Sequence, residues 1–243
     1  IYLFDWLTSV ALMMWIQVIK KWRYELKYIV TDYSNLEIIS MIKRHPVIFS
    51  EIFHERRVNN IYFDTPNFSS FSDNVVGISE RLKTRIRWYG QQFGTIHRPI
   101  LELKIKKAMV GKKESNLLND FSINEKTSSN DIIKMIKHNN MSPLSKKAFL
   151  LTKPVLMNSY IRRYFISSCK RFRITYDTKL TFYSFTGKKR IPVNTAQSIL
   201  EVKFSSNDII YANDIMSYFP FRLNKSSKYV TGINHLVMMP NIY

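Results

Sequence analysis

Positively charged side chains recur at every second position in several short segments of the chain. In residues 81–88 every odd position is Arg or Lys, and the even positions are Leu, Thr, Ile and Trp. Because side chains alternate between the two faces of a β-strand, the four cations share one face. Neighbours in such a row lie about 6.6–7 Å apart and repel one another unless an anion neutralises them. The spacing therefore predicts a ligand with several negative charges.

Five further segments repeat this alternation, with acidic residues among the cations. They are residues 23–28, 101–106, 160–165, 171–177 and 200–204. Glu25, Glu102 and Glu201 fall on the same faces as the neighbouring lysines. Arginine binds phosphate oxygens bidentately through its planar fork, whereas lysine acts as a point charge. The residue types therefore favour a ligand with several phosphate groups.

These segments indicate β-strands, but alternation alone does not fix their arrangement. Each strand taken singly fits a half-buried sheet whose charged face lies in water. Six strands of one kind favour instead a closed antiparallel barrel of about eight strands, with charged faces inward and apolar faces outward. The lumen of that barrel would be a basic tunnel for a polyanion.

Helices are expected to flank the barrel, which makes the fold class α+β. Ser34 and Glu37 form a capping box ahead of an amphipathic segment with Ile38 and Ile42 on one side. Further helices are expected over residues 131–138, over residues 208–219 and from Ser227 onward. The polar residues 107–130 are expected to form a mobile loop or a short hairpin.

Composition limits the protein class without choosing the ligand. The chain has 243 residues, with 37 Lys and Arg against 18 Asp and Glu, for a net charge of +19. That length suits one domain with at most a small appendage. One cysteine, Cys169, excludes an internal disulfide framework, and no Gly-rich phosphate loop of the P-loop type occurs. The charge implies nucleic acid, anionic lipid or a phosphate-rich small molecule as partner.

The first 21 residues differ from the rest of the chain. Residues 1–19 are apolar apart from Asp5, and the uninterrupted stretch over residues 6–19 is shorter than the ~20 residues of a membrane-spanning helix. We interpret residues 1–21 as an apolar helical extension that packs on the domain or on a partner. The expected location is cytoplasmic. Association with a membrane, or with a membrane-protein partner, remains the alternative.

The charged strands occur in an order that resembles a known family. The chain is similar to the triphosphate tunnel metalloenzyme superfamily, and most closely resembles its vacuolar transporter chaperone (VTC) branch, the polyphosphate polymerase domain. The segments that carry the resemblance are residues 23–28, 62–66, 83–89, 101–104, 160–162, 173–177, 200–204 and 225–229. Each motif is weak alone, but the ordered set is specific and places the tunnel domain over residues 22–243.

One departure separates the branches of this superfamily. The first strand reads R-x-E-x-K from Arg23 to Lys27, whereas triphosphatases and class IV adenylyl cyclases resemble E-x-E-x-K. The arginine resembles the polymerase branch and removes one carboxylate from the metal ligands. The resemblance also implies a stand-alone catalytic domain of the bacterial kind. We expect metal-dependent transfer of the γ-phosphoryl group of ATP to a polyphosphate chain, so ATP and polyphosphate are the expected partners.

The resemblance assigns roles to individual side chains. Arg85, Arg87, Arg162 and Glu201 are the expected catalytic residues. The substrate phosphates are expected to be bound by Lys27, Lys104, Tyr160, Arg173, Lys203, Lys225, Ser227 and Lys228. Glu201 is the expected ligand of Mn²⁺ or Mg²⁺, which prefer oxygen ligands. Glu25 and Glu102 either assist it or pair with neighbouring cations.

Two other functions remain open at this point. A triphosphatase of the same fold would use water in place of the acceptor phosphate. A non-catalytic module could bind polyphosphate or nucleic acid, which would favour exposed aromatic side chains next to the cations. Cations and aromatic residues lie on opposite faces of several strands, so no nucleic-acid partner is expected, although Trp88 and Tyr89 keep that alternative open.

The remaining polar residues are weaker candidates. The five histidines show no metal-ligand spacing and are expected on helix or loop surfaces. Asp64 is expected to form a turn rather than to act as a base. Asp177 is expected to orient Arg173 or another cation, with metal binding as the alternative. The basic runs over residues 112–113 and 188–190 are expected in solvated loops, or as guides for a polyanion.

Overall fold

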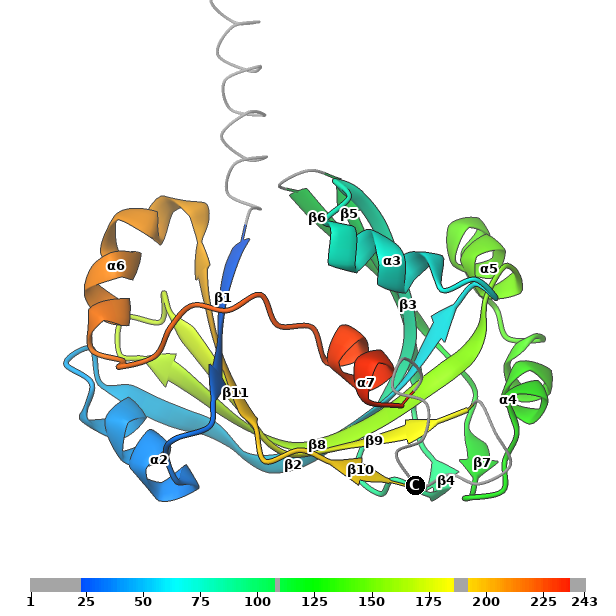
Figure 1. Cartoon of the computed structure of the whole chain (residues 1–243), viewed down its shortest axis with the longest axis horizontal. Helices are drawn as coiled ribbons and strands as arrows, with labels where there is room; N and C mark the ends of the chain where they lie inside the picture. Colours follow the sequence, from blue (N-terminus) through cyan, green and yellow to red (C-terminus); the bar gives the residue numbers. More distant parts are fainter. Residues whose placement is uncertain (1–22, 108–109, 186–191, 237–243) are drawn as a thin grey trace, which may run out of the picture. The chain divides into compact units, whose positions relative to one another are not determined.

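The computed structural model describes residues 23–107, 110–185 and 192–236, which form an α+β fold with a large antiparallel sheet (Figure 1). The chain divides into two compact units. Three long strands contribute to both units, namely β2 (Phe49–Asp64), β8 (Lys153–Ser167) and β9 (Arg173–Ser184). Each unit is therefore built around segments that are far apart in the sequence.

The first unit contains the described residues 23–54, 163–176 and 199–225. Its strands follow the order β1, β11, β9, β8, β2, where β1 is Arg23–Val30 and β11 is Ser198–Ser205. Its helices are α2 (Asn35–Arg44), the short 3₁₀ helix η1 (Ser206–Asp208) and α6 (Ile209–Ser217). The apolar faces of the strands pack against α2 and α6, with Ile38, Ile42 and Ile215 fully or almost fully buried.

The second unit contains the remaining described residues, 55–107, 110–162, 177–185, 192–198 and 226–236. Its strands follow the order β9, β8, β2, β3, β5, β6, with β10 (Val193–Asn194) paired to β9. The new strands are β3 (Glu80–Tyr89), β5 (Ile100–Lys107) and β6 (Val110–Leu117), and β4 (Gly94–Ile96) pairs with β7 (Phe121–Ile123) in a small second sheet. The helices are α3 (Ser69–Val76), α4 (Ser129–Ile136), α5 (Pro143–Leu150) and α7 (Lys228–Leu236).

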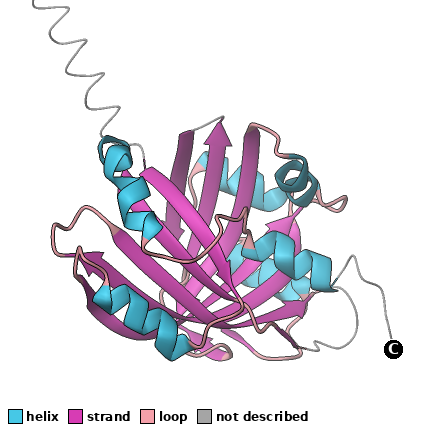
Figure 2. Cartoon of the chain, turned by 60° about the vertical axis from the view of Figure 1, so that its left-hand side comes forward, coloured by secondary structure: helices cyan, strands magenta, loops and turns pink. Residues whose placement is uncertain are grey.

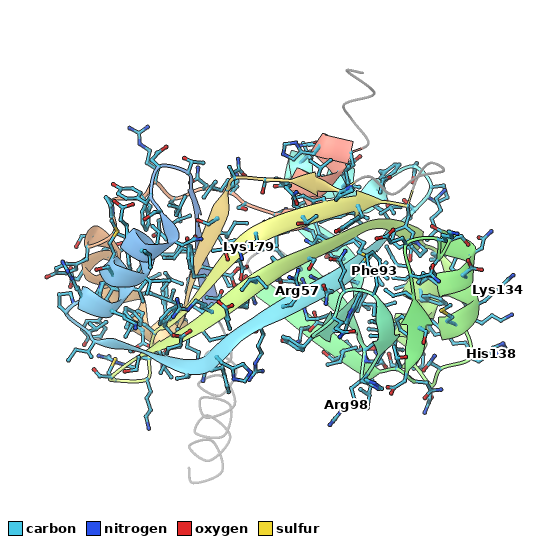
Figure 3. All side chains as sticks on the ribbon, turned by 90° about the horizontal axis from the view of Figure 1, so that it is seen from below. Arg57, Phe93, Arg98, Lys134, His138 and Lys179 are labelled. Carbon is cyan, nitrogen blue, oxygen red and sulfur yellow. The ribbon has the colours of Figure 1, made fainter. Side chains whose placement is uncertain are left out.

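The alternation in the sequence separates two faces of the second unit. Ile86, Trp88 and Leu101 are buried in a core with Ile132 of α4 and Phe149 of α5. Lys134 on α4 and His138, two residues after α4 ends, are exposed, and their side chains point away from the ribbon (Figure 3). The cations of β3 occupy the opposite face, as the pattern predicted. Helix α7 lies against that polar face, because Lys228 contacts Asp177 and Tyr160 there. Figure 2 shows the strands in magenta and the helices in cyan.

Close packing of α7 depends on a glycine. A Cβ atom at Gly232 would lie 2.6 Å from side-chain carbons of both Leu156 on β8 and Phe182 on β9. Contacts that short do not occur between real side chains, so only glycine lets the helix approach the strands this closely. The approach brings Lys228, in the first turn of α7, next to the charged side chains of β8 and β9.

The predicted helices are confirmed, with small shifts at their ends. Both side chains of the Ser34–Glu37 capping box make their reciprocal hydrogen bonds, and a second box at Ser128 and Asp131 starts α4 two residues earlier than predicted. Helix α6 begins one residue later than predicted, directly after η1, and ends two residues earlier, at Ser217. Helices α3 and α5 have only eight residues each and were not predicted.

Two expectations from the sequence need correction. Residues 107–130 are not a loop: β6 forms a hairpin with β5 over its whole length, as the second alternative allowed, and β7 and the start of α4 follow. His45 is not on a surface: it is buried, it contacts Phe49 and Phe219, and its Nε2 lies 2.9 Å from the Ile215 carbonyl oxygen. Burial in this aromatic cluster lowers the pKa of His45.

Some expectations lie beyond what the structure tests. No sheet formed by the described residues closes into a barrel, so the predicted closure stays a prediction. The N-terminal extension over residues 1–21 and the basic run over residues 188–190 lie outside the described residues. Within the described ranges, no helix combines the length and apolar character that crossing a bilayer requires.

Candidate active site

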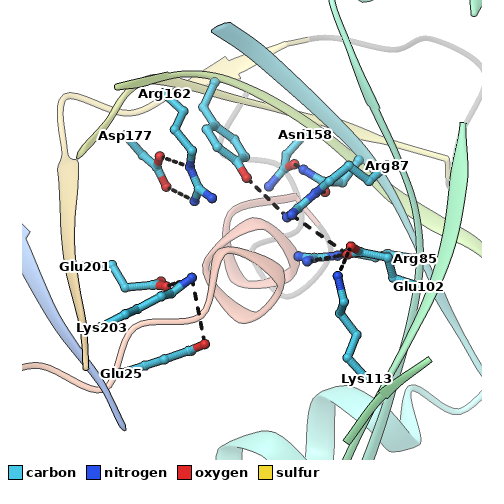
Figure 4. Close-up of polar contacts among 12 residues, drawn as sticks. Glu25, Arg85, Arg87, Glu102, Lys113, Asn158, Arg162, Asp177, Glu201 and Lys203 are labelled. Atoms are coloured by element: carbon cyan, nitrogen blue, oxygen red, sulfur yellow. Dashed lines mark hydrogen bonds and ion pairs between the residues drawn. The ribbon is translucent and has the colours of Figure 1, made fainter. Parts of the chain in front are cut away.

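Glu102 is the centre of the first polar network in the second unit, which we call the Glu102 network (Glu102, Arg85, Arg87 and Lys113). The register places Arg85 of β3 directly opposite Glu102 of β5. Arg85 donates through Nε and Nη2 to Oε2 of Glu102, at 2.7 and 2.6 Å. Lys113 of β6 donates to Oε1 at 2.9 Å, and Arg87 Nη1 lies 3.9 Å from Oε2 (Figure 4). Three cations therefore converge on one buried carboxylate.

This arrangement keeps Glu102 ionised. Burial alone would raise the pKa of its carboxyl group, but the charges of Arg85, Arg87 and Lys113 outweigh burial and lower the pKa to about 2. Near neutral pH the carboxylate is a fixed anion that holds the guanidinium group of Arg85 in place. Glu102 therefore pairs with neighbouring cations, which is one of the two roles expected for it from the sequence.

Arg87 is oriented by a set of neutral groups from β2 and β8. Its Nε donates to Oδ1 of Asn60 at 2.9 Å, and Nδ2 of Asn60 donates to Oδ1 of Asn158 at 2.8 Å. Nη2 of Arg87 also lies 3.4 Å from the hydroxyl oxygen of Tyr160. The Nδ2 group of Asn158 is buried and has no hydrogen-bond partner among the described residues. Asn158 is linked to Arg87 through Asn60, so its buried unpaired donor lies at a position where a phosphate oxygen would satisfy it.

A second carboxylate, Asp177, is the centre of the Asp177 network (Asp177, Arg162, Lys228 and Tyr160). Arg162 donates to Asp177 in a bidentate manner, at 2.6 and 2.7 Å, and Lys228 of α7 donates to Oδ2 at 2.6 Å. Asp177 is fully buried; burial raises its pKa, but Arg162 and Lys228 outweigh burial and lower it. Asp177 therefore orients Arg162 and not Arg173, which agrees with the expectation that it orients Arg173 or another cation.

Tyr160 lies beneath the cations of this second network. The Cζ atom of Arg162 is 5.2 Å, and Nζ of Lys228 is 4.8 Å, from the centre of its ring. Burial raises the pKa of the Tyr160 hydroxyl, but the charges of Arg162 and Arg87 outweigh burial and lower it. A hydroxyl group polarised in this way is a strong hydrogen-bond donor towards an anion.

Ser227, another predicted phosphate ligand, contacts a lysine that was not assigned a role. Nζ of Lys83 donates to Oγ of Ser227 at 3.1 Å and to Oδ1 of Asn74 at 2.6 Å. On the sheet, Lys83 lies opposite Lys104, and Lys104 lies opposite Lys113. Lys83, Lys104 and Lys113 thus form one row across three strands, in which Lys104 is exposed. Lys113 was expected in a solvated loop, but it lies in strand β6.

The first unit holds a different arrangement, which we call the carboxylate cluster (Glu25, Lys27, Glu201 and Lys203). Glu201 is almost buried, with 8% of its side chain exposed, and it lies 2.6 Å from Lys203 Nζ and 3.5 Å from Lys27 Nζ. Glu25, which is one-third exposed, lies 3.8 Å from Lys27 and 3.9 Å from Lys203. Two carboxylates and two ammonium groups thus alternate across the neighbouring strands β1 and β11.

Comparison with protein families gives a match to the VTC domain over residues 22–237, nearly the whole chain. The chain belongs to the VTC domain family. The match confirms the resemblance that the ordered strand motifs suggested. Comparison with curated protein sequences gives no match.

Solved structures show distant similarity to this VTC domain. A candidate adenylate cyclase from Vibrio parahaemolyticus aligns with a TM-score of 0.47 and 14% identity, covering 86% of this chain and 97% of the other. The PH1819 protein from Pyrococcus horikoshii also has a TM-score of 0.47 and 14% identity, with 87% and 99% covered. A candidate adenylyl cyclase from Hippeastrum, described as having a dominant triphosphatase activity, has a TM-score of 0.45 and 11% identity, with 87% and 95% covered.

The carboxylate cluster fits a divalent cation that is bound together with its substrate. Within the described ranges, no three His, Cys, Asp or Glu side chains gather at one point, so a cage built from protein ligands alone is not found there. Mg²⁺ sites commonly use one or two carboxylates and complete their coordination with substrate phosphates and water. Glu201 and Glu25 supply such a pair, and the family implies a divalent metal ion.

Two predicted phosphate ligands, Arg173 and Lys225, lie apart from these networks. Both are exposed in the first unit, and neither belongs to the clusters described above.

Asp64, which was expected in a turn, accepts hydrogen bonds from the backbone N–H groups of Thr65 and Ser70, and it also contacts the hydroxyl group of Tyr229. Asp64 therefore fixes the start of α3 and its contact with α7.

The aromatic residues that kept nucleic acid open differ in exposure. Trp88 is buried in the core, and its Nε1 donates to the Gln91 carbonyl oxygen at 2.9 Å, so it cannot stack on a base. Tyr89 is 47% exposed, with Cζ of Arg56 located 6.0 Å from the centre of its ring. Of these two aromatic residues, only Tyr89 is positioned to contact a ligand.

Proposed function

We propose that this VTC domain is a metal-dependent polyphosphate polymerase, which transfers the γ-phosphoryl group of ATP to the end of a polyphosphate chain. The observation that carries the proposal is the charge of the two networks on the polar face of the second unit. Five cations surround Glu102 and Asp177, so the networks carry a net charge of +3 when all groups are ionised. In a VTC domain this excess suits phosphate groups that carry several negative charges.

The proposed reaction needs positioning and charge neutralisation more than covalent catalysis. An oxygen of the acceptor's terminal phosphate forms a bond to the γ-phosphorus, and the bond from that phosphorus to the bridging oxygen breaks, which releases ADP. Arg85 and Arg87 bind the transferring phosphoryl group through guanidinium forks that Glu102 and Asn60 hold in place. Because these donors are oriented before the substrate binds, little reorganisation is needed as negative charge shifts during transfer.

Arg162, Lys228 and Tyr160 bind neighbouring phosphates in the proposed complex. Asp177 keeps the Arg162 guanidinium group in its plane, and α7 supplies Lys228. The expected barrel closure and its basic tunnel belong to this proposal, with ATP and polyphosphate as the partners. A donor of this kind also fits the cytoplasmic location expected from the sequence.

The proposed metal ion is Mn²⁺ or Mg²⁺, held by Glu201 with Glu25 as the second carboxylate. When bound, the ion would neutralise phosphate charge and act as a Lewis acid. Lys203 and Lys27 hold the two carboxylates on one face of the neighbouring strands β1 and β11. With an ion bound, their ammonium groups would be donors for the substrate phosphates.

Incubation with ATP and Mn²⁺ tests the proposed function. The products are separated on a gel that resolves phosphate chains, and ADP is measured in parallel. We expect long chains and one ADP per phosphate added. Arg85→Ala should reduce the rate by about 10²–10³-fold, because it removes an oriented donor to the transferring group.

A matched control variant is Arg163→Ala. Arg163 makes a bidentate ion pair with Glu51, at 2.8 and 2.6 Å, in the first unit and outside the networks. Its loss should leave the rate within a few-fold of the wild type. Orthophosphate as the only product would identify a triphosphatase, and binding of polyphosphate without turnover would identify a binding module. Either result rejects the polymerase.

A further inference from the structure

The polar face of the second unit becomes apolar at one end. Arg87 of β3 pairs with Ile100 of β5, and Ile100 pairs with Leu117 of β6. Directly paired residues share a face, so the row that holds the cations continues into two aliphatic side chains. Tyr89 follows Arg87 by two positions and therefore also lies on this face. An aromatic and aliphatic surface thus begins where the row of cations ends.

These residues line a pocket. Tyr89, His97, Arg98, Ile100 and Leu117 enclose an open cavity of about 370 Å³. Tyr89 is 47% and Leu117 is 58% exposed, so their apolar surfaces are available to a ligand. A volume of this size lies within the range of about 300–1,000 Å³ that small-molecule pockets occupy.

Polar groups fix the rim of the pocket. Asp120 lies 2.5 Å from Nδ1 of His97 and accepts a hydrogen bond of 2.9 Å from the backbone N–H of Arg98. Arg98 has a positive φ of 50°, and its side chain points away from the ribbon (Figure 3). Cζ of Arg56 lies 6.0 Å from the centre of the Tyr89 ring. The rim therefore combines a stacking surface with two arginines.

We propose that this pocket binds the nucleobase of the ATP donor, while the row that ends at Arg87 binds its phosphates. The inference rests on the proposed function, because it identifies the donor as a nucleotide and not merely as a phosphate chain. Residues two positions apart on a strand are separated by about 6.6–7 Å, a distance that the ribose can bridge between a base on Tyr89 and phosphates at Arg87. Stacking on an aromatic ring suits any base, and the neighbouring cations favour a ligand that carries negative charge.

Binding measurements on the whole chain separate the base from the phosphates. Calorimetric titrations with ATP and with inorganic triphosphate are compared for the wild type and for Tyr89→Ala. We expect Tyr89→Ala to weaken ATP binding by about tenfold, as removal of one stacking contact does elsewhere. Its affinity for inorganic triphosphate should remain that of the wild type, because the phosphate ligands are unchanged.

Tyr211→Ala is the matched control. Tyr211 is 43% exposed, and Cζ of Arg171 lies 4.7 Å from the centre of its ring, but it belongs to α6 in the first unit. This variant should bind both ligands as the wild type does. An equal loss of both affinities in Tyr89→Ala, or no loss of ATP affinity, would overturn the nucleobase site. Failure of the wild type to bind either ligand would instead reject the proposed function.

Photolabelling provides a direct second readout. ATP with an azido group on the adenine is crosslinked to the wild type, and the labelled peptides are identified by mass spectrometry. We expect label on the peptides that contain Tyr89, Arg98 or Leu117, and protection by excess unmodified ATP. Label confined to other peptides would contradict the assignment. Competition by a single-stranded oligonucleotide, but not by ATP, would point to nucleic acid in the pocket and would also reject it.

Discussion

The carboxylate cluster of the first unit and the two networks of the second unit use the same charged groups in opposite proportions. Around Glu201, two acids meet two lysines, and three of these four side chains are between 28% and 33% exposed. Around Glu102 and Asp177, two acids meet five cations, and both acids are nearly or fully buried. The charges of the first arrangement balance, whereas the second carries an excess of positive charge around two buried acids.

The difference separates two chemical tasks. Lysine ammonium groups are single-point contacts on flexible stems, so a carboxylate held by lysines can exchange its partner for a metal ion at little cost. Arginine forks held by buried acids keep a fixed geometry, which suits oriented phosphate binding. In the proposed polymerase, the carboxylate cluster provides the metal ligands, and the Glu102 and Asp177 networks provide the preorganised phosphate ligands.

The largest expected effect is a loss of stability when the charge of Asp177 is removed. Asp177→Asn leaves Arg162 and Lys228 close together and largely buried without their acid. Breaking a buried ion pair from one side costs about 3–5 kcal/mol, so the free energy of unfolding should fall by about that much. Urea titration followed by circular dichroism measures the change.

Glu25→Gln is the counterpart in the carboxylate cluster. Glu25 and its two lysine partners are each about one-third exposed, and pairs of this kind contribute about 0–1 kcal/mol. Its unfolding midpoint should remain near that of the wild type. Similar losses in both variants would show that the two regions do not differ in the way described.

The next largest effect is the dependence of stability on pH, to which Glu102 contributes. Its pKa is about 2 in the folded protein, below the ordinary value of 4.5, so the folded state binds this proton less tightly than the unfolded state does. The resulting stability is present above pH 4.5 and is lost as the pH falls from there towards 2. A shift of this size corresponds to about 3 kcal/mol.

Urea unfolding at a series of pH values between neutrality and pH 3 measures this loss. Glu102→Gln removes the titrating group, so the variant should be less stable at neutral pH but should lose less stability on acidification. Parallel pH profiles for the wild type and the variant would mean that other carboxylates determine the acid sensitivity of the fold.

Much of the second unit's polar face could be predicted from the sequence, because period-two alternation determines which side chains share a face. Arg85, Arg87 and Glu102 were assigned correctly to one surface for that reason. The partners within that surface could not be predicted. The pairing of Arg85 with Glu102 depends on the register between β3 and β5, and neither segment contains a signal for register.

Two kinds of residue were missed for different physical reasons. Lys113 lies in β6, a polar strand without apolar alternation, whose structure comes from pairing with β5 and not from its own propensity. Asn60 and Asn158 are buried amides that bind each other across two strands. Nothing local in the sequence distinguishes such amides from exposed ones, because their burial results from tertiary packing.

The smallest expected effect tests the metal assignment and completes the comparison. Glu201→Gln keeps the side-chain volume but removes the charge of the proposed ligand, so more Mn²⁺ should be needed for half-maximal polymerisation. We expect an increase of at least about tenfold, because replacing even a residue that only supports a metal ligand typically costs about 10–100-fold in metal affinity. Glu102→Gln is the matched change in the Glu102 network, where the carboxylate orients Arg85. That variant should polymerise more slowly at every Mn²⁺ concentration, and the Mn²⁺ concentration for half-maximal rate should be unchanged.

The two variants would then separate the metal requirement from the rate. Loss of a metal ligand raises the Mn²⁺ concentration that is needed, whereas loss of an acid that orients Arg85 lowers the rate of the complex that is already formed. An increased Mn²⁺ requirement in Glu102→Gln alone would move the metal to the second unit and reverse the assignment.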